Sequence, residues 1–97
     1  MIVSSSDDPG VYTLLALDIR AQREDRIRAI ATLGQFATTT AAEALLELGG
    51  RNDENPEILQ AAGTALGALA HLGVRITEFD LRDLERAAYE AYCSWQE

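Results

Sequence analysis

Residues 56–73, with the sequence PEILQAAGTALGALAHLG, decide the fold of this chain. Apolar residues recur in this stretch every three or four positions, which is the spacing of one face of an α-helix. The inward positions are Ile58, Leu59, Ala62, Leu66 and Leu69. Asn55 is a good helix cap, Pro56 suits the first helical turn, and Gly73 is a typical stop. The sequence therefore predicts a long amphipathic helix over 56–72.

A related pattern occurs 33 residues earlier in the chain. The pattern RxxAIxxLG at 26–34 aligns with LxxAGxxLG at 59–67, and LxxAAxxAY at 84–92 resembles both weakly. The small residues of these patterns allow a neighbouring helix to approach closely. They are Ala29, Gly34, Ala62, Gly63 and Gly67. A fixed spacing of this size predicts stacked helical hairpins.

Helical spacing continues on both sides, and no stretch alternates with a period of two. We expect a first helix that is capped by Asp8, has Pro9 in its first turn and runs to about residue 20. Further helices are expected over 23–36 and 41–48, the latter with a capping box formed by Thr40 and Glu43. A fifth helix, capped by Thr77 or Asp80, is expected to run on past Trp95. The expected inward residues are Val11, Leu14, Leu15 and Ile19 in the first helix, and Leu81, Leu84, Ala88, Ala91 and Trp95 in the fifth. The predicted fold is all-α, with residues 1–10 as a polar lead-in and 11–97 as one domain of about five antiparallel helices.

The paired motifs resemble the HEAT-like helical repeat family, especially its short bacterial form. The matching text is DRIR at 25–28 with AI and LG, and then PEIL at 56–59 with Ala62 and LG. It covers about 24–73, half of the chain, and Leu59 stands where the family often has arginine. The resemblance implies a short α-solenoid in which the first and last helices act as caps.

Composition excludes several classes of function. Among the 97 residues, eight arginines and no lysine stand against sixteen acids, which gives a net charge of -8. Nucleic acids and anionic membranes both require a basic face, so neither is an expected partner. No apolar run is long enough to span a membrane, and we expect a cytoplasmic protein. The absence of lysine and the many alanines suggest a GC-rich bacterial genome.

Catalytic chemistry would depend on His71 and Cys93, the single histidine and the single cysteine. One cysteine excludes an internal disulfide, and this pair is too small for a Cys/His zinc cluster. His71 lies in the last turn of the predicted helix, where a histidine interacts favourably with the helix dipole. Cys93 is typical of a small buried apolar residue. We therefore expect no enzyme, no cofactor and no metal.

The acids gather near predicted helix starts, where they have two interpretations. They are a solvated rim that satisfies helix dipoles, or they are a docking face for a basic protein. Three aromatic residues of the last helix are either core or binding hot spots. The candidate partner-binding residues are Asp53, Glu54, Glu57, Glu78, Asp80, Asp83, Glu85, Tyr89, Glu90, Tyr92 and Trp95.

A second resemblance concerns the design of the whole chain. A compact, acidic, helical protein of this length is similar to the immunity proteins of bacterial polymorphic toxin and contact-dependent inhibition systems, as is the closing stretch GVRITEFDL at 73–81. This resemblance implies a protein that binds a cognate basic toxin domain and covers its active site. The alternative is a scaffold that self-associates or bridges larger partners, and when free the chain is expected to be a monomer or a homodimer.

Overall fold

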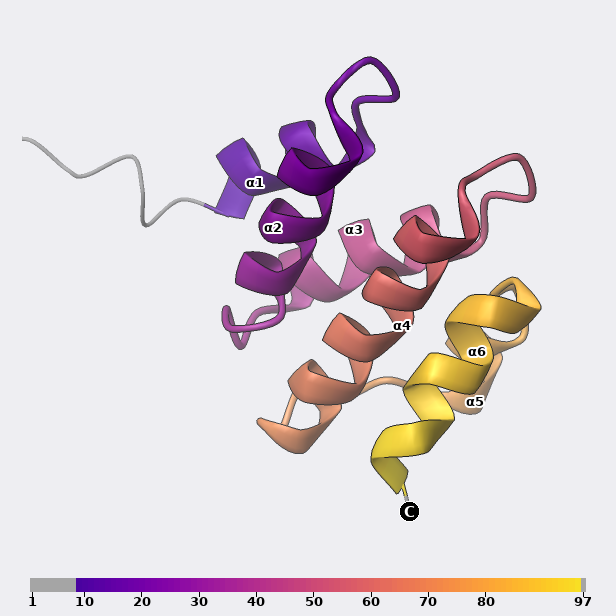
Figure 1. The fold of residues 1–97 in the computed structure, drawn as a ribbon. Coiled ribbons are helices and arrows are strands. Elements are labelled where there is room, and N and C mark those ends of the chain that lie inside the picture. The colour runs from indigo at the N-terminus through magenta and orange to yellow at the C-terminus, as the bar shows by residue number, and fades with distance from the viewer. Residues whose placement is uncertain (1–8, 97) are drawn as a thin grey trace, which may run out of the picture.

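The computed structural model describes residues 9–96, and within that range it contains six α-helices, one short 3-10 helix and no strand (Figure 1). The α-helices are α1 (Pro9–Leu17), α2 (Arg23–Leu33), α3 (Thr39–Gly49), α4 (Pro56–His71), α5 (Glu78–Leu81) and α6 (Arg86–Cys93), and η2 (Ser94–Gln96) follows. The predicted all-α class is therefore confirmed for the described residues. No helix among them is long and apolar enough to cross a membrane.

The helices form two layers. α2, α4 and α6 lie side by side with α4 in the middle, and α1 and α3 pack behind them (Figure 1). α5 lies behind α6 in the same view. Residues 1–8 of the predicted lead-in, including the predicted cap Asp8, lie outside the described residues. α1 begins at Pro9, the residue that the sequence places in the first helical turn.

The core lies between the two layers and is built mainly from α2, α3 and α4. Its largest fully buried side chains are Ile30, Leu33, Leu45, Leu48, Ile58, Leu66 and Leu69. The layer formed by α2, α4 and α6 is packed closely because glycines lie where its helices cross. A Cβ on Gly63 would collide with the carbonyl oxygen of Ala88 in α6, and one on Gly67 would collide with the ring of Trp95. The expected role of these two glycines is thereby confirmed.

The ends of the helices follow the predicted signals in α4 and depart from them in α3. The Asn55 side chain accepts a hydrogen bond from the Glu57 amide at 2.8 Å, and Gly73 has a φ of 101°, which glycine adopts without strain. α3 is capped by Thr38, whose Oγ1 accepts from the Ala41 amide at 3.1 Å. The predicted Thr40 cap is wrong because α3 begins at Thr39, which leaves Thr40 inside the first turn.

The single helix predicted over the last twenty residues is wrong, because the chain breaks it into α5 and α6. Residues 82–85 form the break, where the Glu85 amide donates a hydrogen bond to the Gly49 carbonyl at 2.8 Å. The Asp83 carbonyl would lie 2.9 Å from a Cβ on Gly50, so only glycine permits this approach without a shift. Docking on the end of α3 therefore interrupts the helix and moves α6 into the layer of α2 and α4.

The inward face predicted for the first helix is also wrong. Leu14 and Ile19 are both 74% exposed and Leu15 is 36% exposed, whereas Ala16 is buried. The side chain of Val11 lies outside the described residues. Tyr12 instead faces the core, where its ring lies 5.8 Å from that of Phe36. Among residues 9–96, no other element covers the apolar residues on the outer side of α1.

Candidate protein-binding surface

One predicted surface residue, Glu54, lies inside the molecule. Its two carboxylate oxygens accept hydrogen bonds from Nη1 and Nη2 of Arg26 at 3.0 and 2.7 Å, and both side chains are 6% exposed. The hydrogen bonds from Arg26 hold the pKa of Glu54 below its ordinary value, against the opposing effect of burial. This carboxylate is therefore occupied by Arg26 and is not presented to a partner.

The Arg26–Glu54 pair also holds α1 in place. Arg26 Nε donates to the carbonyl of Ala16 at 3.0 Å, and Arg51 Nη1 donates to the carbonyl of Leu17 at 3.1 Å. These carbonyls belong to the last turn of α1, where no intrahelical donor reaches them. Two cations at this end also interact favourably with the helix dipole. The pair thus joins α1, α2 and the turn before α4.

Several of the predicted acids have internal partners at the surface. Glu57 binds Arg23 at 2.7 Å, and Glu90 binds Arg86 at 2.9 Å. Asp80 forms a capping box with Thr77, each side chain accepting from the other's amide at 3.1 Å. The other predicted acids are Asp53, Glu78 and Asp83, which are exposed, and Glu85, which is half-buried at the start of α6.

The three predicted aromatic residues separate into core and surface. Tyr92 is 7% exposed and belongs to the core, and burial raises the pKa of its hydroxyl. Trp95 is 43% exposed, covers Gly67 and has its ring 5.9 Å from that of His71. Tyr89 is 45% exposed, and its hydrogen bond with Cys93 raises the pKa of its hydroxyl. Tyr89 lines a surface hollow.

Two hollows flank α5, and together with that helix they form what we call the α5 surface. One hollow, of about 360 Å³, lies between α3 and α5, and the other, of about 410 Å³, lies between α5 and α6. The first is lined by Leu46, Glu47, Gly50, Phe79, Asp80 and Asp83, and the second by Glu78, Leu81, Arg82 and Tyr89. The α5 surface thus collects four of the predicted residues: Glu78, Asp80, Asp83 and Tyr89.

The sequence argument missed Phe79, which is 72% exposed on the α5 surface. The Arg82 guanidinium lies over this ring, with its carbon 6.0 Å from the ring centre. Phe79 stands off the apolar stripe of the predicted helix, between Glu78 and Asp80. Because an acid stands on either side of it in the sequence, Phe79 could have been predicted to be exposed.

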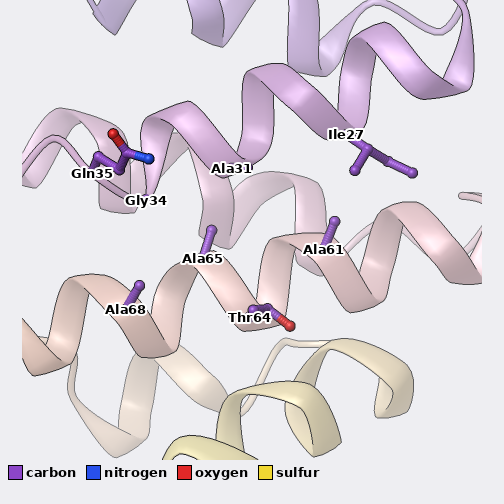
Figure 2. A pocket seen from close by; sticks show the side chains of 8 residues that line it. All are labelled: Ile27, Ala31, Gly34, Gln35, Ala61, Thr64, Ala65 and Ala68. Atoms are coloured by element: carbon purple, nitrogen blue, oxygen red, sulfur yellow. The ribbon is translucent and has the colours of Figure 1, made fainter.

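A third hollow, the α2–α4 groove, runs between the two neighbouring helices of the front layer (Figure 2). It has a volume of about 380 Å³, and Figure 2 shows the methyl groups of Ala61, Ala65 and Ala68 directed from α4 towards α2. Ile27 and Gln35 lie near its two ends. The lining carries no ionisable side chain, so the groove offers shape and apolar contact rather than chemistry.

The described residues contain no group of three or more His, Cys, Asp or Glu side chains that is arranged to hold a metal ion. Comparison of the chain with known protein families, curated proteins and solved structures finds no match.

Proposed function

We propose that this protein is a non-enzymatic binding module that docks on a basic protein through the α5 surface. One observation carries the proposal: Phe79 is 72% exposed beside a hollow lined by Glu47, Asp80 and Asp83. A large aromatic side chain left in water next to carboxylates has the composition of a binding hot spot with a charged rim.

The charges of the chain support a basic partner. The net charge of -8 creates a long-range attraction for a basic surface and speeds the encounter with it. Glu78 and Asp83 are exposed, so their charges remain available to a partner. Phe79 would then supply the desolvated contact at the centre, and the surrounding carboxylates would select the partner.

The most concrete form of this proposal is a bacterial immunity protein. A toxin that acts on nucleic acid needs a basic groove to bind phosphates, and an acidic domain placed over that groove blocks it. The size and acidity of the chain fit this role, in which no chemistry by the binding module is needed.

We also propose that the six helices form a minimal HEAT-like stack of three pairs, α1–α2, α3–α4 and α5–α6. α2 and α4 carry the two aligned motifs, and equivalent positions have equivalent tasks. Gly34, the C-cap residue of α2, lies against Ala65 of α4, while Gly67 of α4 lies against Trp95 beyond α6. In this proposal, the break at 82–85 divides the last predicted helix into the two members of a third pair.

The experiment that tests the function is a co-expression assay. The protein encoded beside this gene is expressed with and without the chain, growth is followed, and the two proteins are purified together. We expect the neighbour to arrest growth alone, and to be silenced in a stoichiometric complex. A harmless neighbour that does not co-purify would overturn the immunity role.

Two matched pairs of variants locate the contact. Phe79→Ala is expected to weaken the complex by about tenfold or more, whereas Leu72→Ala, at a 53% exposed position away from α5, leaves it unchanged. Asp83→Lys is expected to slow association, and Glu24→Lys on α2 provides its control. Equal effects within both pairs would show that the partner binds elsewhere.

A further inference from the structure

α1 is a helix without charge at one end of the molecule. Its sequence, PGVYTLLAL, contains no acid and no base, although a quarter of the whole chain is charged. Its outer side exposes Leu14 and Leu15, and Ile19 follows in the next turn; we call these three residues the α1 face. A helix that is apolar on its outer side as well is typical of one that is covered on both sides.

The charge distribution indicates what covers the α1 face. Residues 1–35 carry four arginines and five acids, a net charge of -1, whereas residues 36–97 carry four arginines and eleven acids, a net charge of -7. Two copies of this chain therefore repel one another over most of their surfaces. The least repulsive approach brings the two neutral α1–α2 ends together, where each copy also offers exposed leucine.

We propose that two copies of the chain associate through the α1 face about a two-fold axis. In such a contact the same patch serves both copies, so the acidic remainders point away from each other. An antiparallel arrangement of the two α1 helices also places opposite ends of their dipoles side by side. α5 lies at the far end of the molecule from α1 (Figure 1), so each copy keeps its α5 surface free. The proposal is thus independent of the function proposed above.

The size of the α1 face predicts a weak dimer. A helix of nine residues is about 13 Å long, and three apolar side chains fall well short of the roughly 800 Å² per partner of a stable interface. We expect a reversible equilibrium at high micromolar concentrations. Added salt should strengthen it, because screening removes repulsion between two copies with a charge of -8.

The test is sedimentation velocity of the purified chain from about 10 μM to about 1 mM, at low and at high salt. Two variants are compared: Leu14→Glu in the α1 face, and Phe79→Glu as a control at an equally exposed apolar position on α5. We expect the parent chain and Phe79→Glu to form dimers that tighten with salt. Leu14→Glu should weaken the dimer by about tenfold or more, because each copy then places a charge in the contact.

Three results would overturn the proposal. The first is a parent chain that stays monomeric up to about 1 mM in high salt. The second is loss of the dimer in Phe79→Glu and its retention in Leu14→Glu. The third is growth beyond the dimer with increasing concentration, because a two-fold contact closes and a head-to-tail contact does not. Circular dichroism of Leu14→Glu confirms that the variant is folded before its mass is compared.

Discussion

Glu54→Gln is expected to lower the free energy of unfolding by about 3 kcal/mol at neutral pH. The substitution keeps the size and the planar shape of the side chain, but it removes the charge that faces the Arg26 guanidinium. Both side chains are 6% exposed, so water cannot take the place of the carboxylate. Removing one partner of a buried ion pair leaves an uncompensated charge, which is the costly case. A domain of this size is stable by about 5–15 kcal/mol, so the loss is large.

The same argument fixes the dependence on pH. The pKa of Glu54 is lower in the folded chain than its ordinary value of 4.5, because Arg26 binds the ionised form. A group with a lowered folded pKa contributes stability above its unfolded pKa and loses it as the pH falls through the folded value. The gap between the parent and Glu54→Gln should therefore be constant above about pH 5 and should shrink below about pH 4.5.

The assay is urea unfolding followed by circular dichroism at a series of pH values. The control is Glu57→Gln, because Glu57 and Arg23 make the same type of pair with side chains 57% and 54% exposed. An exposed pair contributes at most about 1 kcal/mol, so this variant should lose little. Equal losses in the two variants, or a Glu54→Gln deficit that persists unchanged at low pH, would refute the assignment of Glu54 to the interior.

Three further predictions concern stability measured by urea unfolding. Gly63→Ala should destabilise the chain by about 1–3 kcal/mol despite the better helix propensity of alanine, because the new methyl group collides with the backbone of α6; an unchanged midpoint would contradict the close crossing of α4 and α6. Thr38→Ala should cost about 1 kcal/mol and Thr40→Ala much less, and the opposite order would restore the capping box at Thr40. Leu66→Ala should cost about 2–5 kcal/mol because Leu66 is fully buried, whereas Leu14→Ala should scarcely change the stability of the monomer; similar losses would place Leu14 in the core.

The sequence predicts α4 well because every signal there is local. Asn55 and Pro56 form the start, Gly73 forms the stop, and the apolar spacing between them selects the buried face. The close packing of Gly63 was also predictable, since a glycine inside a helix lowers helix stability and needs a compensating reason. In α4 the local sequence signals and the tertiary packing favour the same helix bounds and the same buried face, so the sequence alone predicts both.

The errors occur where a distant residue decides the local structure. The pattern from Leu81 to Trp95 fits one helix, but hydrogen bonding of Glu85 to Gly49 at the end of α3 breaks it. In α1 the apolar spacing favours Leu14 and Leu15 as inward residues, yet Arg26 and Arg51 bind the carbonyls of its last turn and orient it. Periodicity alone contains neither of these contacts, because both depend on residues at least ten positions away.

The candidate site was only partly predictable for the same reason. Glu54 and Asp83 are both acids next to a predicted helix start, and composition cannot tell them apart. The difference arises from Arg26, which reaches Glu54 across 28 positions of sequence, whereas Asp83 is exposed. Phe79 was missed because the predicted helix was continuous, and a continuous helix offers no reason to examine the residues on either side of a break.

The break between α5 and α6, which the sequence did not predict, also shapes the proposed binding surface. Gly50 lacks a side chain, so the Asp83 carbonyl can approach it, and the same glycine lines the hollow beside Phe79. The interruption fixes a short helix with an acid on either side of an exposed aromatic ring. A larger residue at position 50 would therefore perturb the docking of α5 and the shape of the surface together, so stability and binding should change in the same variant.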